Sequence, residues 1–161
     1  GAAGLDVENV TLADASKAAR LTFNNVAVDA DAVVGEVDRG WNPLTRALNA
    51  GRAGAAAELV GVAAGASHMT VEYLKQRKQF GRLIGEFQAL QHRAAHLYGE
   101  IEIARAATWK AAELLDKGDP RAELMVSVAK AKAARTSALA VQEGVQMHGG
   151  IGMTDEHDIG L

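Results

Sequence analysis

Hydrophobic and polar positions follow two different periods along this chain. Over residues 5–34 apolar and polar residues alternate in short stretches, most clearly at 19–23, which predicts β-strands. The Asn-Asn pair at 24–25 predicts a turn before the apolar residues 26–28. Because two short strands are marginally stable alone, we expect this region to belong to a sheet whose other strands lie elsewhere.

From residue 42 onward, apolar residues recur at spacings of three and four, which predicts three long helices. Asn42 and Pro43 predict an N-cap and a first helical position, and Gly81 predicts the end of the first helix. The Gly-Asp-Pro sequence at 118–120 separates the second helix from the third, and Gly149 ends the third. The periodic apolar positions are Ala55, Leu59, Val62, Ala66, Met69 and Tyr73; then Phe87, Leu90, Ala94, Leu97, Ile101, Ala104 and Thr108; then Leu124, Val128, Ala131, Ala134, Ala138, Val141 and Val145.

Thr154, Asp155 and Glu156 resemble the start of a fourth helix. The predicted fold class is therefore mainly α: an up-down bundle of three long helices and the start of a fourth, preceded by one or two short β-strands.

The composition excludes several classes of function but does not identify one. The chain has 161 residues, a formal net charge of -3 and no cysteine, so we expect no nucleic-acid partner, no disulfide and no thiolate metal site. No apolar run approaches the roughly 20 residues that span a bilayer, so we expect no membrane insertion and a cytoplasmic protein. Aromatic residues are only 4% while alanine and glycine are abundant, which predicts helices whose backbones approach closely.

Two stretches carry candidate chemistry. The first is Arg77, Gln79 and Phe80, followed by Gln88 at the start of the second helix. Taken alone, this is an ordinary helix end with cations near its C-terminus. Its alternative role is to bind an anionic, hydrogen-bonding ligand such as a pyrophosphate, because arginine offers bidentate contacts and glutamine both donates and accepts.

The second stretch runs from Gln146 through Gly149 and Gly150 to Gly152. Glycines let a ligand approach the backbone amides, but an ordinary interhelical loop is the simpler interpretation of this motif alone. It is not the dinucleotide-binding fingerprint of a Rossmann fold, because Asp155 occupies the place of the third glycine and a helix precedes it.

Other polar clusters are weaker candidates. His92 and His96 lie one turn apart, but Arg93 stands where a metalloprotease helix carries glutamate, so we expect no metal site. The acidic residues at 155–158 suit the first turn of a helix, and a paired acid/base site is the minor alternative.

Together the two main stretches resemble the C-terminal domain of FAD-dependent acyl-CoA dehydrogenases. The shared features are an RxQFG stretch after one long helix, a glutamine opening the next, and a QxxGGxG loop after the third. The resemblance runs from about Val10 to Leu161. It assigns residues 1–37 to the tail of the middle β-domain and its linker, and residues 38–161 to the helical bundle.

The resemblance implies that FAD lies between subunits and that this domain holds its ADP half from the neighbouring subunit. Arg77, Gln79 and Phe80 match positions that meet the pyrophosphate and adenine region, and Gln88 matches a flavin-contacting glutamine. Gln146, Gly149 and Gly150 match the loop around the adenosine and diphosphate. The implied reaction oxidises an acyl-CoA thioester, with hydride transfer to FAD and onward transfer to an electron-transferring flavoprotein.

The departures concern the catalytic base. Most members carry a glutamate some twenty-five residues beyond the glycine loop, and a minority carry one just before the arginine that Arg52 matches, where this chain has Gly51. We therefore name no catalytic residue and expect the chain by itself to be inactive. We expect a fragment of a homodimer or homotetramer. The alternatives are a non-catalytic partner subunit, a flavin-dependent monooxygenase relative, and a plain helical interaction module.

Overall fold

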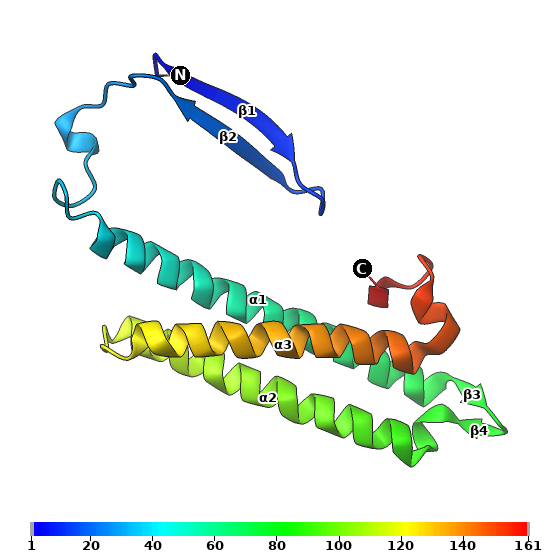
Figure 1. Ribbon diagram of the computed structural model, residues 1–161. Coiled ribbons are helices and arrows are strands. Elements are labelled where there is room, and N and C mark those ends of the chain that lie inside the picture. The colour runs from blue at the N-terminus through cyan, green and yellow to red at the C-terminus, as the bar shows by residue number, and fades with distance from the viewer. Residues whose placement is uncertain (1, 161) are drawn as a thin grey trace. The chain divides into compact units, whose positions relative to one another are not determined.

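The computed structural model describes residues 2–160, and its contacts divide the chain into two units, Gly1–Leu44 and Thr45–Leu161. The first unit contains a β-hairpin and the second contains three long helices (Figure 1). The predicted fold class, a mainly α bundle preceded by short strands, is confirmed. The predicted domain boundary at residues 37 and 38 remains a prediction.

The hairpin pairs β1 (Leu5–Thr11) with β2 (Lys17–Phe23) in antiparallel register. Its two faces differ as the alternating pattern predicts: Val7 lies opposite Leu21 on one face, and Glu8 lies opposite Arg20 on the other, joined by a 2.6 Å salt bridge. The hairpin turn falls between Thr11 and Lys17. The Asn-Asn pair at 24–25 forms a bend after β2, but residues 26–28 form no strand, since no neighbouring strand among the described residues pairs with them.

The first helix, α1 (Trp41–Gln76), begins one residue earlier than the predicted N-cap. The amide of Leu44 donates to the carbonyl oxygen of Gly40, which makes Gly40 the capping residue. Pro43 therefore occupies the third helical position, where a missing N–H still costs no intrahelical bond. The helix also ends five residues before Gly81, because the chain turns into a second, very short hairpin.

That hairpin joins α1 to α2. Its strands are β3 (Lys78–Gln79) and β4 (Arg82–Leu83), with Phe80 and Gly81 at φ of 56° and 79°. Two successive positive φ angles are typical of the tight turns that match strand twist. The 3-10 turn η2 (Ile84–Glu86) then leads into α2 (Gln88–Asp116).

A short capped turn connects α2 to α3 (Ala122–His148). The carboxylate of Asp119 accepts a 2.8 Å hydrogen bond from the amide of Arg121, and its carbonyl accepts the amide of Ala122. After α3 the chain forms two 3-10 turns, η3 (Gly149–Met153) and η4 (Asp158–Gly160). The predicted fourth helix does not begin at Thr154, which is extended, so the expected start is wrong in the described residues.

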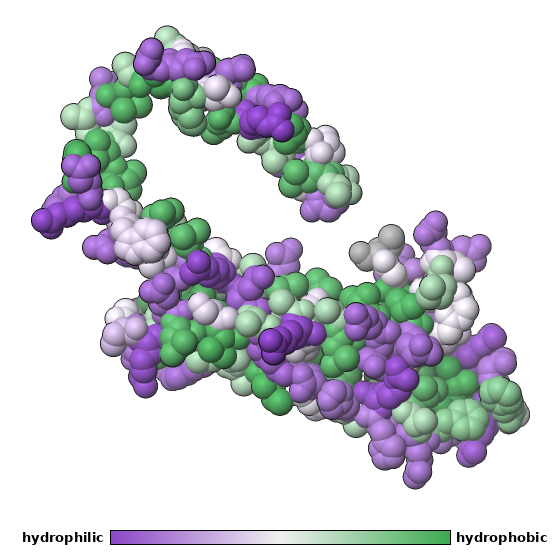
Figure 2. Space-filling view, viewed as in Figure 1, coloured by the Kyte–Doolittle hydropathy of each residue, from purple (hydrophilic) through white to green (hydrophobic). Residues whose placement is uncertain are grey.

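The apolar positions that predict α3 lie mostly on its outer surface. Leu124 is 69% exposed and Val128 is 46% exposed, and apolar patches lie over α3 on the face shown in Figure 2. On α1, Val62 is likewise exposed, whereas the periodic positions Leu97, Ile101 and Ala104 of α2 are buried as a core face should be. The exposed apolar side chains of α1 and α3 therefore lie on the flanks of the bundle, whereas others of these two helices are buried, namely Val60, Leu74, Val126 and Met147.

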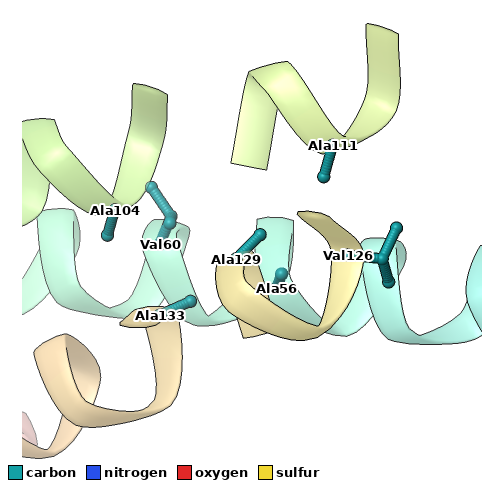
Figure 3. Packing of buried hydrophobic residues seen from close by; sticks show 7 residues of the cluster. All are labelled: Ala56, Val60, Ala104, Ala111, Val126, Ala129 and Ala133. Atoms are coloured by element: carbon teal, nitrogen blue, oxygen red, sulfur yellow. The ribbon is translucent and has the colours of Figure 1, made fainter. Parts of the chain in front are cut away.

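Small side chains form the centre of the bundle. Nine of the seventeen buried hydrophobic residues are alanines, and the backbones of α2 and α3 approach each other closely. Figure 3 shows the main cluster, which draws on all three helices: Ala56, Val60, Ala104, Ala111, Val126, Ala129 and Ala133. The close approach expected from the alanine-rich composition is found between α2 and α3. No helix among residues 2–160 combines the length and apolar character that crossing a bilayer requires.

Gly144 marks the closest approach near the end of α3. A Cβ atom placed there would lie 2.7 Å from Ile159 Cδ1 and 3.1 Å from Thr70 Oγ1. Ile159 of η4 is itself buried and belongs to a second core cluster with residues of all three helices. The absence of a side chain at Gly144 thus lets α1 and the C-terminal segment pack against α3.

Candidate functional site

A cleft of about 570 Å³ lies at the end of the bundle that carries the short hairpin. Its volume falls within the roughly 300–1,000 Å³ typical of small-molecule sites. One wall comes from the end of α1 and the hairpin, and the other from the end of α3 and η3, with α2 contributing one residue. The lining residues are Tyr73, Arg77, Gln79, Ile84, Leu90, Gln146, Met147, His148, Gly149, Gly150 and Ile151.

Backbone hydrogen bonds hold the wall formed by the end of α1 and the short hairpin. The amide of Arg77 donates to the Tyr73 carbonyl at 2.9 Å, which continues the helical pattern beyond α1. The Arg77 carbonyl accepts the amide of Ile84, also at 2.9 Å, which closes the hairpin. The guanidinium of Arg77 is exposed, and no carboxylate among residues 2–160 forms a salt bridge with it. A cation without a protein counter-charge is suited to bind an anionic ligand.

The second wall is largely bare backbone. His148 is the last residue of α3, and Gly149 follows with a φ of 67°, a conformation that glycine adopts without strain. A Cβ atom at Gly149 or Gly150 would meet no other atom within 4 Å, so the backbone there faces open space. Gln146, less than one turn earlier, adds an exposed amide side chain. A flat or phosphorylated ligand could therefore approach the main chain on this side.

The charged side chains that line the cleft include a cation but no carboxylate. Arg77 supplies a positive charge, and no aspartate or glutamate is among the lining residues. Gln79 and Gln146 add amide groups, while Ile84, Leu90 and Ile151 add apolar surface. This combination suits a ligand with a phosphate group and a ring system, because the charge and amides meet the phosphate and the apolar side chains cover the ring.

Five of the seven residues predicted to bind a cofactor share this cleft, namely Arg77, Gln79, Gln146, Gly149 and Gly150. The structure does not bring the other two to it. Phe80 is 91% exposed because it sits at the tip of the hairpin, where its ring lies edge-on to Phe87 at 6.3 Å. Gln88 is exposed as the first residue of α2.

Sequence reasoning missed two aromatic residues of the cleft as site residues. Tyr73 lies one helical turn before Arg77, and His148 lies within the Gln146–Gly150 motif, so their spacing was the available signal. Their rings stack with centroids 4.4 Å apart and an interplanar angle of 29°. Burial lowers the pKa of His148, an effect that its hydrogen bond to Gly144 opposes and the neighbouring His157 reinforces.

The other candidate clusters do not form comparable sites. His92 and His96 are exposed on α2, and no group of three or more potential metal ligands occurs among residues 2–160. Arg52, in the first half of α1, donates from Nη1 to Asn49 Oδ1 at 3.2 Å. Gly51 beside it is exposed and carries no side chain that could accept a proton.

Comparison with known proteins decides the family. Residues 38–161 match the family model described as acyl-CoA dehydrogenase, C-terminal domain. The chain belongs to the acyl-CoA dehydrogenase family. It is 39% identical over 145 residues to the short/branched chain specific acyl-CoA dehydrogenase of Bos taurus, which covers 90% of this chain and 33% of that protein. It thus spans about a third of the length of that relative.

Solved structures of the family share the fold. The structure of butyryl-CoA dehydrogenase from Megasphaera elsdenii matches with a TM-score of 0.92 and 31% identity, covering 99% of this chain and 42% of that one. The acyl-CoA dehydrogenase IpdE2 of Mycobacterium tuberculosis is 46% identical over 108 residues, or 66% of this chain and 31% of that protein. The resemblance inferred from the two sequence motifs is therefore confirmed at the level of the family.

Proposed function

We propose that this chain provides the ADP-binding half of an FAD site in an acyl-CoA dehydrogenase. The observation that supports this most directly is the single cleft shared by Arg77, Gln146 and Gly150. In this proposal Arg77 binds the pyrophosphate, because its charge has no carboxylate partner among residues 2–160. Gly149 and Gly150 let the nucleotide approach the backbone, and Gln79 and Gln146 donate or accept hydrogen bonds at its polar edges.

The residues of the cleft fit the group. A phosphate needs a cation and donors, and the lining residues provide both without an acidic side chain that would repel it. An adenine ring needs apolar surface, which Ile84, Leu90 and Ile151 provide. Phe80 and Gln88 remain proposed cofactor contacts, and their exposure leaves them free to meet a cofactor that a neighbouring subunit holds.

For the whole protein we propose oxidation of an acyl-CoA thioester to the trans-2-enoyl-CoA. FAD, when bound, would supply the hydride acceptor for that reaction. The part of the chain described here would bind and orient the cofactor. Gly51 cannot remove the α-proton, so in this proposal a carboxylate elsewhere in the protein serves as the base. Electrons would pass onward to an electron-transferring flavoprotein.

We further propose that the protein is a homodimer or homotetramer. The exposed apolar side chains of α3, including Leu124 and Val128, support this, because large apolar patches on soluble proteins are usually covered by a partner. Sedimentation velocity tests the assembly, and a monomer at high concentration would contradict it. The cytoplasmic location also remains a proposal, which cell fractionation would test.

Titration calorimetry with ADP tests the proposed site directly, since ADP carries only the adenosine and pyrophosphate. We expect binding that weakens as salt concentration rises, and an affinity about tenfold or more lower in Arg77→Gln, the usual consequence of losing a charge-assisted hydrogen bond. Arg82→Gln is the matched control. Arg82 belongs to the same hairpin but pairs with Glu86 at 3.0 Å and does not line the cleft.

Unchanged ADP affinity in Arg77→Gln, or no ADP binding at all, would contradict the site.

The second candidate function is that of a partner subunit that holds the cofactor but performs no chemistry. Gly51 is compatible with it, and one solved neighbour, 29% identical, is the ChsE4–ChsE5 complex of Mycobacterium tuberculosis, which pairs two different chains. Reduction of the protein-bound flavin by acyl-CoA separates the two, since only the enzyme shows it.

A further inference from the structure

Three aromatic rings meet behind the glycine wall of the cleft. His148 stacks on Tyr73 of α1, and its ring centroid lies 4.4 Å from that of His157 at an angle of 53°. His157 also meets the edge of Tyr73, with centroids 6.4 Å apart. His148 ends α3, and His157 lies in the C-terminal segment between η3 and η4. The rings therefore join that segment, residues 149–160, to the ends of two helices.

The surroundings of His148 favour a neutral ring. Its Nδ1 lies 2.7 Å from the carbonyl oxygen of Gly144, and because a carbonyl only accepts, Nδ1 carries the proton and donates. Its Nε2 is buried without a hydrogen-bond partner, and the residue as a whole is 3% exposed. A second proton on Nε2 would place a charged donor in a buried position with nothing to accept it.

The hydrogen bond of His157 also favours a neutral ring, but in the opposite tautomer. Its Nδ1 accepts the amide of Ile159 at 3.2 Å, so Nδ1 carries no proton and the neutral ring is protonated on Nε2. A second proton on Nδ1 would remove that acceptor. Ile159 is the residue that secures the segment, since its side chain is 3% exposed and packs with Ala63, Leu97 and Ala140.

The charged groups around the rings do not favour protonation of His148. From α1, Arg77 lines the same cleft and is a cation, while Tyr73 is stacked on the ring. On α3, the nearest acid in sequence is Glu143, which is paired with Arg93 of α2 at 2.5 Å. In the C-terminal segment Asp155 shares a small hollow with His157, not with His148.

We propose that His148 and His157 form an acid-sensitive latch that holds residues 149–160 against the bundle. When both rings are neutral, the contacts of the His157 ring with His148 and Tyr73, together with the burial of Ile159, keep the segment closed. A proton on His157 removes the acceptor of the Ile159 amide, and a proton on His148 places a buried charge at Nε2, where nothing accepts it. In either case the charge faces the other imidazole. The segment then detaches, Ile159 leaves the core, and the glycine wall formed by residues 149–151 loses its support.

The direction of the pH dependence follows from the pKa of His148, which burial lowers from the ordinary value of 6.5. In the open state the ring takes up a proton at its ordinary pKa, while the closed state resists protonation. The latch is therefore fully stable above about pH 6.5 and weakens as the pH falls toward the lower pKa of the closed state. It opens on acidification and closes on return to neutral pH.

Nuclear magnetic resonance of the 161-residue chain tests the latch without any ligand. We expect the Hε1 signal of His148 to titrate below about pH 6.5, the usual value for an exposed histidine, and the Ile159 methyl signal to move from its buried position over the same range. After correction for intrinsic exchange, the protection of the Ile159 amide should fall about tenfold per pH unit in that range. A His148 midpoint at or above 6.5, or an unchanged Ile159 environment down to about pH 5, would overturn the proposal.

Two variants test whether His148 causes the pH-dependent opening. His148→Phe retains a ring for the stack but accepts no proton, so we expect its Ile159 signals to shift less, and at lower pH, than those of the parent chain. His92→Gln removes an exposed histidine of α2 and should titrate like the parent. Identical opening in His148→Phe and the parent would contradict the role of His148. If ADP affinity falls over the same pH range, opening of the latch also weakens the cleft. This last step rests on the proposed function. The methyl signal tests the latch itself, because it needs no nucleotide.

Discussion

Arg77 and Gly150 line the same cleft, although one follows α1 and the other follows α3. Their proximity arises because α1 and α3 end at the same end of the bundle, where the short hairpin and η3 extend them. The two sequence motifs are thus opposite walls of one site. Neither motif identifies a ligand by itself, but together they present a cation, amides and open backbone to the same space.

Filling the glycine wall should block the cleft without disturbing the fold. A Cβ atom at Gly150 meets nothing within 4 Å, so Gly150→Val should fold normally while its side chain occupies space at the ligand's edge. We expect ADP affinity to fall by about tenfold or more, or about 1.4 kcal/mol. Titration calorimetry measures this. The control is Gly61→Val, an exposed position of α1 with equally open surroundings, and an equal loss in both variants would contradict the assignment.

A buried hydroxyl offers a way to stabilise the bundle. Thr136 is 1% exposed and its Oγ1 has no hydrogen-bond partner, so Thr136→Val should raise the free energy of unfolding by about 1 kcal/mol. Thr70, equally buried, donates from Oγ1 to the Ala66 carbonyl at 2.7 Å, so Thr70→Val should bring no such gain. Urea unfolding of both variants compares them. A loss of stability in Thr136→Val would show that its hydroxyl has a partner.

The buried alanines of the bundle should not tolerate larger side chains. Ala133 is fully buried where α3 meets the other two helices, so Ala133→Leu should lower the free energy of unfolding by about 1–3 kcal/mol through overpacking. Ala131, two residues earlier on the exposed side of α3, should accept leucine with a change within about 0.5 kcal/mol. Thermal unfolding distinguishes the two. Equal effects would mean that the small side chains do not set the helix separation.

The carboxylate of Glu113 should make stability depend on pH in the acid range. Lys110 at 2.8 Å and Lys117 at 2.5 Å lower its pKa from 4.5 to about 2. A carboxyl with a lowered pKa stabilises the fold above its unfolded value and loses that contribution as the pH falls through its folded value. The stability difference between the parent and Glu113→Gln should therefore shrink between about pH 5 and about pH 2, and salt should reduce it, because the group is exposed.

Unfolding measured across that range tests the prediction. The control is Asp116→Asn, because Asp116 forms no salt bridge among residues 2–160 and lies on the same helix, directly before Lys117. A difference that stays constant with pH would mean that the two lysines do not hold the Glu113 carboxylate.

The sequence predicted the helices better than their packing. Spacings of three and four identified all three helices, and the Gly-Asp-Pro turn was placed correctly because glycine, proline and a capping acid act locally. The buried faces of α1 and α3 were not predictable in this way. Alanine occurs on several sides of both helices, so periodicity favoured the larger side chains such as Leu124, which lie outside. Tertiary packing, not local pattern, selects Ala129 and Ala133 for the centre.

The candidate site shows the same limit. Arg77 and the glycines were found because their residue types match a known motif. The same motif includes Phe80, but it could not show that the hairpin turn directs this ring into solvent and away from the cleft. Nor did it point to the buried imidazole of His148, since burial depends on Tyr73 and His157, which come from distant parts of the chain.

The missing side chain at Gly144 has a consequence for ligand size. This residue sets how near the last turn of α3 comes to Thr70, one turn before Tyr73 on α1. The opposing walls of the cleft continue from those two helix ends, so we expect a methyl group at Gly144 to displace Ile159 and to move these ends slightly apart. We therefore expect the width of the cleft to depend on Gly144, a residue that does not line it.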